Sequence, residues 1–118
     1  MSERKLKAGA RKIGLFGGSF NPIHNAHLRL ALSAWQFLDL AQVQLLPAGQ
    51  PWQKKPLQVS AENRLAMLRL AIQDMPQLQI NTMEIERDGP TYTIDTLKSL
   101  PPDANYYWLM GSDQLNNF

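Results

Sequence analysis

A glycine turn followed by two histidines is the part of the sequence best suited to chemistry. It runs from Gly17 to His27 and reads Gly-Gly-Ser-Phe-Asn-Pro-Ile-His-Asn-Ala-His. The paired glycines allow an anion to approach backbone amides closely, and a helix that begins after them presents unpaired N–H groups and a positive dipole end. Because the dipole alone contributes only about 0.3–1 kcal/mol at an exposed site, phosphate binding here needs further converging donors.

The two histidines are candidates for those donors. His24 and His27 are three residues apart, so they fall on neighbouring positions of one helical face if the helix has begun there, and together they could grip one phosphate chain. The spacing alone is weak evidence, because helix capping, ordinary packing and metal binding also produce it. Zinc is less attractive, since the chain has neither cysteine nor an H-E-x-x-H arrangement. We expect no metal held by protein side chains alone.

Apolar residues alternate between strand-like runs and helical spacing along the chain. Residues 13–16 form a short apolar run that stops at the glycine turn, whereas residues 28–38 carry apolar side chains at helical spacing. Ser60 is suited to cap a second helix, which Pro76 ends. The pattern predicts strands at residues 13–16, 43–46, 78–80 and 106–110 and helices at 25–37, 61–75, 93–99 and 114–118, and the third strand can continue to Ile85.

This alternation predicts an α/β fold, a Rossmann-like doubly wound parallel sheet that is truncated after about four strands, with right-handed crossovers and helices on both faces. Ligands of such folds gather at the carboxyl ends of the strands. Residues 47–59, with three prolines and a glycine, form an irregular connection whose length favours a functional role. We therefore expect residues 17–27, 47–59, 87–93 and 111–113 at one edge of the sheet.

Size and charge limit the remaining possibilities. A chain of 118 residues with 44% hydrophobic content is expected to form a single domain. Residues 1–12 carry a net charge of +4 and the remainder carries −2, which predicts a basic flexible tail rather than a nucleic-acid arm or an organelle-targeting peptide. No apolar run is long enough to span a membrane and the start lacks a secretory h-region, so the expected compartment is the cytoplasm.

Three segments in order resemble one enzyme family. Residues 17–28 are similar to the G-G-[ST]-F-[DN]-P-[IV]-H-x-[GA]-H signature of the nicotinate-mononucleotide adenylyltransferases. Residues 90–97, Pro-Thr-Tyr-Thr-Ile-Asp-Thr-Leu, resemble the family's P-[ST]-Y-T-x-x-T-L segment, and residues 110–113, Met-Gly-Ser-Asp, resemble its [IM]-G-x-D turn. The departures are Asn21 in place of the common aspartate, Ala26 in place of glycine, and Trp52-Gln53-Lys54 in place of Pro-His-Lys.

The resemblance extends from Ile13 to the end of the chain. Family members are longer and carry a further I-S-x-[ST]-x-[IV]-R segment that contacts ATP phosphates, and this segment is absent here. We therefore interpret residues 13–118 as the amino-terminal part of a nucleotidylyltransferase domain.

The resemblance implies transfer of AMP from ATP to nicotinate mononucleotide, which gives deamido-NAD and pyrophosphate in NAD biosynthesis. The phosphate of the mononucleotide attacks the α-phosphorus of ATP without a covalent enzyme intermediate, so catalysis is mainly alignment and charge stabilisation. The resemblance assigns the catalytic contacts with the ATP phosphates to His24 and His27, and Mg²⁺ arrives with the nucleotide. It places the following residues along the nucleotide: Gly17, Gly18, Ser19, Phe20, Asn21, Gly111 and Asp113.

The carboxylate on the pyridine ring of nicotinate mononucleotide is best bound by backbone N–H groups or by a cationic side chain. Candidates are Lys54, Tyr92 and Thr93, with Trp52 stacking on the substrate. Each has a plainer interpretation, because Tyr92 could be a core aromatic residue, Thr93 a helix N-cap and Trp52 a loop residue packed on its own protein.

Two other functions remain open. A phosphopantetheine adenylyltransferase or a cytidylyltransferase shares the H-x-G-H logic and the same sheet, although the Tyr92-Thr93 segment argues against both. The chain could also be a non-catalytic nucleotide-binding module that uses the turn as a phosphate sensor. The sequence gives no indication of the oligomeric state.

Overall fold

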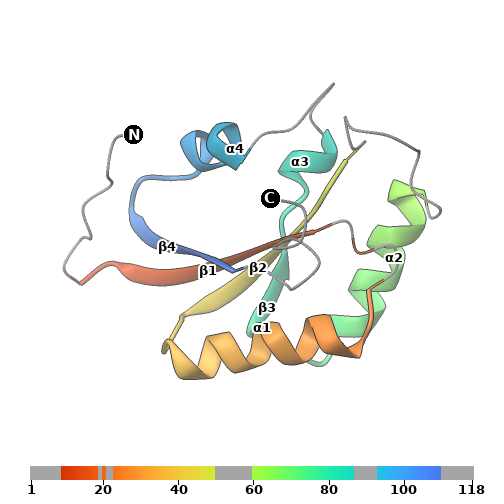
Figure 1. Ribbon diagram of the computed structural model, residues 1–118, viewed down its shortest axis with the longest axis horizontal. Helices are drawn as coiled ribbons and strands as arrows, with labels where there is room; N and C mark the ends of the chain where they lie inside the picture. The colour runs from red at the N-terminus through yellow and green to blue at the C-terminus, as the bar shows by residue number, and fades with distance from the viewer. Residues whose placement is uncertain (1–8, 19, 21–22, 50–59, 87–92, 110–118) are drawn as a thin grey trace.

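The computed structural model describes residues 9–18, 20, 23–49, 60–86 and 93–109, in which strands and helices alternate (Figure 1). The elements, in chain order, are β1 (Arg11–Gly18), α1 (Asn25–Phe37), β2 (Gln42–Pro47), α2 (Ala61–Ile72), β3 (Leu78–Ile80), α3 (Met83–Glu86), α4 (Thr93–Ser99) and β4 (Ala104–Leu109).

The strands form one parallel sheet in the order β3-β2-β1-β4. β1 is central, with Gly14 opposite Val43 of β2 on one side and Tyr107 of β4 on the other. Ile13 through Gly17 are buried without interruption, as expected of a parallel strand covered on both faces. The predicted Rossmann-like parallel sheet is therefore confirmed.

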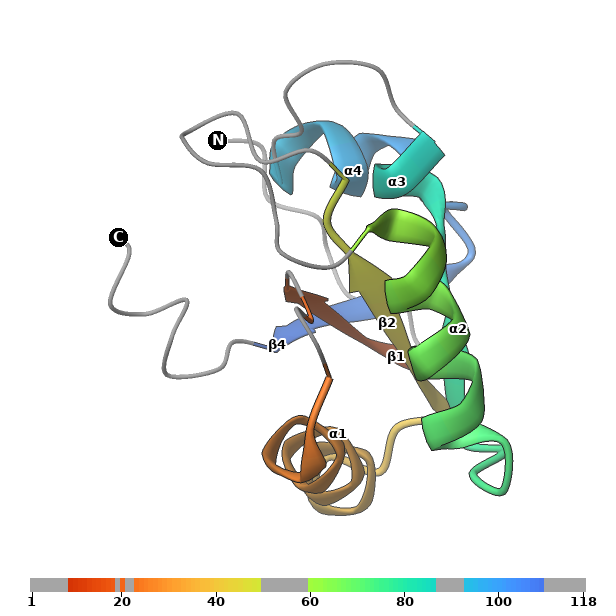
Figure 2. The same cartoon turned by 90° about the vertical axis from the view of Figure 1, so that its right-hand side faces the viewer.

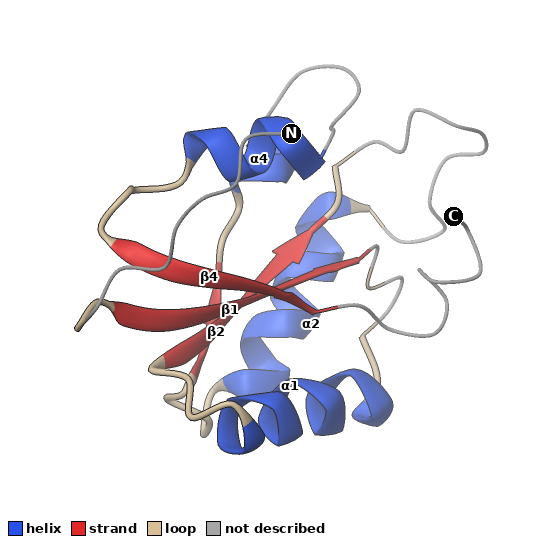
Figure 3. Ribbon diagram, turned by 60° about the vertical axis from the view of Figure 1, so that its left-hand side comes forward, coloured by secondary structure: helices blue, strands red, loops and turns tan. Residues whose placement is uncertain are grey.

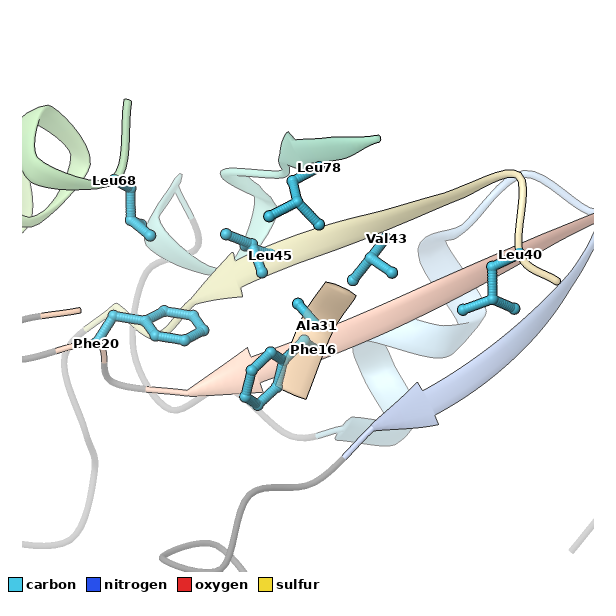
Figure 4. Close-up of a cluster of buried hydrophobic side chains, with 8 residues drawn as sticks. All are labelled: Phe16, Phe20, Ala31, Leu40, Val43, Leu45, Leu68 and Leu78. Carbon is cyan, nitrogen blue, oxygen red and sulfur yellow. The ribbon is translucent and has the colours of Figure 1, made fainter. Parts of the chain in front are cut away.

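Helices cover both faces of this sheet. α1 and α2 lie on one face, and α3 and α4 lie on the other (Figures 1, 2 and 3). The first face holds a cluster centred on Phe16 and Leu45, to which α1 contributes Ala31 and α2 contributes Leu68 (Figure 4). The second face holds a cluster of Ile13, Leu15, Leu46, Leu100 and Ala104. The alternation of side chains along each strand divides the core into these two layers.

The helix ends follow local signals. α1 has the predicted bounds, and the chain reverses after it at Asp39, whose φ of 54° lies in the left-handed region that aspartate tolerates. Ser60 caps α2 as predicted, because its Oγ accepts a hydrogen bond from the Asn63 N–H at 3.2 Å. α2 ends at Ile72, so Met75 lies beyond the helix that we expected to include it.

Other predicted boundaries also differ from the structure. β1 continues through Gly17 and Gly18, so these glycines end the strand and do not form the turn that the sequence predicted. β1 begins at Arg11, so Arg11 and Lys12 belong to the sheet rather than to a tail ending at residue 12; the Lys12 ammonium donates to the Leu38 carbonyl. β4 runs from Ala104 to Leu109, beginning two residues earlier than predicted. The extension of the third strand to Ile85 is wrong, because β3 ends at Ile80 and α3 follows.

A side chain explains the end of β3. Asn81 donates its backbone N–H to the Leu45 carbonyl at 2.8 Å, and its side-chain oxygen accepts the Met83 N–H at 3.0 Å. This second bond satisfies one of the free amides at the start of α3 and turns the chain into a helix. The side-chain amide nitrogen of Asn81 also donates to Gln44 Oε1 at 3.0 Å, and this bond fixes the Asn81 side chain.

The predicted helix at residues 114–118 lies outside the described residues. No helix in the described part of the chain is long and apolar enough to cross a membrane.

Candidate functional site

The connection from β1 to α1 has Phe20 at its centre. Phe20 is only 2% exposed, although its φ of 46° lies in the left-handed region, where a residue with a large side chain is uncommon. Its ring contacts Phe16 edge to face, with 5.5 Å between the ring centroids. Burial of the ring offsets the backbone cost of roughly 1–2 kcal/mol. Phe20 therefore holds its own position, between the end of β1 and the start of α1, against the core.

His24 and His27 lie together at the start of α1. His24 is the exposed N-cap residue, with extended backbone angles, and half-buried His27 is the third residue of the helix. His27 Nδ1 accepts the His24 backbone N–H at 3.1 Å, and the two ring centroids are 3.9 Å apart. The first turn of α1 thus brings the two predicted side chains together, as the phosphate-site hypothesis requires.

The hydrogen bond to Nδ1 determines what His27 can offer a ligand. A neutral imidazole has one donor and one acceptor nitrogen, so an accepting Nδ1 assigns the proton to Nε2. The Phe20 ring meets the imidazole edge to face, with 5.1 Å between the centroids, and helps to hold its orientation. His27 therefore serves as a helix cap, one of the alternatives that its spacing left open, and also carries an Nε2 donor.

Arg64 of α2 holds the chain directly after β2 through a hydrogen bond to Ala48. The Ala48 N–H, directly after β2, donates to the Gly18 carbonyl at 2.8 Å, and the Ala48 carbonyl accepts Arg64 Nη1 at 2.6 Å. Arg64 is 3% exposed, and burial lowers the pKa of its guanidinium from the ordinary value, although arginine stays protonated in proteins. The ends of β1 and β2 are thereby tied to α2.

A buried polar pair lies on the opposite face of the sheet. Thr96 of α4 donates its hydroxyl to Glu84 Oε2 of α3 at 2.7 Å, and both residues are buried. The sequence patterns gave no role to Glu84 or Arg64, and Thr96 entered only as a member of the matched segment 90–97. A signal existed for Arg64, because it lies four residues before Leu68 on the buried stripe of α2.

The structure brings five of the predicted nucleotide-site residues to the carboxyl end of β1, namely Gly17, Gly18, Phe20, His24 and His27. Thr93 is the first residue of α4, and its side chain is outside the described part. Also outside the described residues are Ser19, Asn21, Trp52, Lys54, Tyr92, Gly111 and Asp113. In the described ranges, no group of three or more histidine, aspartate or glutamate side chains is arranged to hold a metal ion.

Known proteins are similar to this chain in sequence and in fold. Residues 15–118 match the family model described as cytidylyltransferase-like. A relative from Bordetella petrii, named probable nicotinate-nucleotide adenylyltransferase, is 58% identical over 108 residues, which are 92% of this chain and 55% of the relative. A relative of the same name from Laribacter hongkongensis is 49% identical over 107 residues, covering 87% of this chain and 49% of that protein. The chain thus spans about half the length of these curated relatives.

Solved structures agree on the fold. Nicotinic acid mononucleotide adenylyltransferase from Plasmodium falciparum, complexed with NaAD, superposes with a TM-score of 0.73 at 22% identity over 91% of this chain and 55% of that one. A second structure of the Plasmodium enzyme, complexed with APC, gives a TM-score of 0.67 at 21% identity. The family match covers β1 from Leu15 onward, both histidines and every later element, and the chain therefore belongs to the cytidylyltransferase-like family.

Proposed function

We propose that this chain forms the nucleotide-binding part of an enzyme that transfers AMP from ATP to nicotinate mononucleotide, giving deamido-NAD and pyrophosphate, in a cytoplasmic step of NAD biosynthesis. The observation that carries this proposal is the pairing of His24 and His27 at the start of α1, directly after the glycine end of β1. The names of relatives at up to 58% identity support the choice of nicotinate mononucleotide as acceptor.

The described residues suit a transfer in which no group of the protein forms a covalent bond. As the acceptor phosphate attacks the α-phosphorus, negative charge builds on the phosphoryl oxygens and on the departing pyrophosphate. The His27 Nε2–H, the His24 ring and the amides at the start of α1 are donors that can meet this charge. Because the capping bond and Phe20 already orient His27, little reorganisation is needed during reaction.

Gly18 lies at the same edge, as the last residue of β1. Among the described residues, the three atoms nearest to a Cβ built there belong to the Phe20 ring and lie at 3.5 Å or more, which is ordinary van der Waals contact. The described neighbours therefore do not require a glycine at this position. Close approach of a phosphate to the backbone gives a reason for one.

Mg²⁺ fits this site as an ion that the nucleotide carries. Magnesium prefers carboxylate, phosphate and water oxygens, whereas the described residues at this edge supply imidazoles and amides. The protein groups would then bind the phosphates, and the ion would neutralise part of the phosphate charge.

A substrate panel tests the proposed function. The intact protein is incubated with ATP and, in turn, nicotinate mononucleotide, nicotinamide mononucleotide or phosphopantetheine, and with CTP in place of ATP, and pyrophosphate release is followed. We expect ATP to react at least about tenfold faster with nicotinate mononucleotide than with nicotinamide mononucleotide. The reason is that a charge-assisted hydrogen bond to the carboxylate is worth about that factor.

The other outcomes identify the alternatives. A preference for phosphopantetheine or CTP would assign the chain to another branch of its family. Calorimetric binding of ATP without pyrophosphate release from any acceptor would favour a nucleotide-binding module that has no transferase activity.

A further inference from the structure

Thr96 and Glu84 form a polar anchor inside the second face of the molecule. The Thr96 hydroxyl is 0% exposed and donates to Glu84 Oε2 at 2.7 Å, and Glu84 is 8% exposed. A hydrogen bond to a carboxylate in such surroundings is among the stronger ones in proteins. Because α4 has only seven residues, its position depends on contacts with the rest of the protein rather than on its own helical stability.

The backbone of α3 at Glu84 also lies very close to Gly49, which follows β2. A Cβ built on Gly49 would lie 2.7 Å from the Glu84 carbonyl oxygen and 3.4 Å from the Ile85 Cα, so only glycine fits there without movement of backbone. Asn81 holds the start of α3 through its bonds to Met83 and Gln44. Gly49, Glu84 and Thr96 therefore form one continuous set of contacts, which we call the α3–α4 anchor.

α3 and α4, which carry Glu84 and Thr96, lie on the face of the sheet opposite α1 (Figures 1 and 2). In the sequence, Gly49 comes three residues before Trp52, and Thr96 comes three residues after Thr93. The α3–α4 anchor thus holds two points of the backbone, Gly49 and Thr96, that are each three residues in sequence from a candidate for binding the pyridine substrate. The nucleotide-phosphate donors depend instead on β1 and α1.

We propose that Thr96 and Glu84 are positioning residues that set the affinity for the acceptor mononucleotide and leave ATP binding largely unaffected. This inference rests on the proposed function. Loss of the Thr96 hydroxyl removes a donor from a buried carboxylate and loosens the first turn of α4 against α3. A displacement of a supporting element by a fraction of an ångström is enough to weaken a site that is built on it.

The test compares Thr96→Val with Thr96→Ser in the intact protein. Valine keeps the shape of threonine without the hydroxyl, and serine keeps the hydroxyl. We expect Thr96→Val to raise the KM for nicotinate mononucleotide about tenfold, as loss of one buried hydrogen bond does, with the KM for ATP and kcat within about twofold of wild type. Thr96→Ser keeps the hydroxyl, so its acceptor KM should be within about twofold of the wild-type value.

Thr82→Val is the matched control. The Thr82 hydroxyl also donates to a glutamate, Glu86, but this pair lies on the exposed surface of α3. Exposed polar pairs contribute little, so we expect all three kinetic constants to stay at the wild-type values.

The outcomes separate this inference from the proposed function. If Thr96→Val does not fold, Glu84→Gln takes its place. The Thr96 hydroxyl can still donate to the amide oxygen, but the bond is weaker because the acceptor is no longer charged, so a smaller rise in the acceptor KM alone supports the inference. A folded variant with an unchanged acceptor KM, or with equal rises in both KM values, overturns it. A wild-type protein that releases no pyrophosphate from ATP and nicotinate mononucleotide overturns the proposed function, and this inference with it.

Discussion

His27→Ala is expected to lower kcat for adenylyl transfer about 10²–10³-fold, the usual loss when one preorganised donor to a charged transition state is removed. The physical reason is that His27 Nδ1 is occupied by the His24 N–H, so the ring presents Nε2–H in a fixed direction. The measurement is pyrophosphate release by the intact protein at saturating ATP and nicotinate mononucleotide. Unchanged turnover would remove His27 from the mechanism.

His27→Asn separates catalysis from helix capping. Its side-chain oxygen can still accept the His24 N–H, but it has no donor at the position of Nε2. We expect this variant to be as slow as His27→Ala while its unfolding free energy stays closer to wild type, because a lost cap costs about 0.5–2 kcal/mol. Recovery of turnover in the asparagine variant would assign the loss to the cap and not to a phosphate donor.

The sequence predicted those parts of the fold that depend on short-range patterns. The bounds of α1 follow from apolar residues at helical spacing, and Ser60 caps α2 through a hydrogen bond only three residues away. The uninterrupted burial of β1 was likewise visible as an apolar run that ends in glycines. Such features depend on neighbours in the chain, so a single sequence contains them.

The errors occurred where a distant contact decides between two local structures. Met83 and Ile85 alternate with glutamates and so fit a strand, but Asn81 caps a helix there while Gln44, 37 residues away, holds the Asn81 side chain. Buried polar partners are equally hidden, because Thr96 meets Glu84 across 12 residues and Arg64 meets Ala48 across 16. Charge and polarity alone suggest a solvent-exposed position for such residues.

For the candidate site, the sequence indicated where the two histidines lie but not which contacts they make. The resemblance singled out both histidines, and the structure places them at the expected edge of the sheet. The resemblance could not show that His27 Nδ1 accepts the capping hydrogen bond or that the Phe20 ring belongs to the core. The contact of the Phe20 backbone with the nucleotide stays a prediction.

Gly18→Ala is expected to weaken ATP binding by the intact protein about 100-fold, which corresponds to the loss of about two charge-assisted hydrogen bonds between phosphate and backbone amides. Stability should not fall. The new Cβ meets the Phe20 ring at an ordinary 3.5 Å, Gly18 has no positive φ, and alanine in a strand is favoured over glycine by about 0.5–1 kcal/mol. Isothermal titration with ATP and chemical unfolding of the same sample measure the two effects.

Gly14→Ala is the matched control in the same strand. Its Cβ would lie 2.7 Å from Leu40 Cδ1 and 3.2 Å from Val43 Cγ2, inside the core, so overpacking should cost about 1–3 kcal/mol of unfolding free energy. Its ATP dissociation constant should stay at the wild-type value, because Gly14 is the fourth of the eight residues of β1 and lies away from the carboxyl end of the strand. If Gly18→Ala binds ATP as wild type does, or if both variants lose affinity in proportion to stability, the phosphate does not approach the backbone at Gly18.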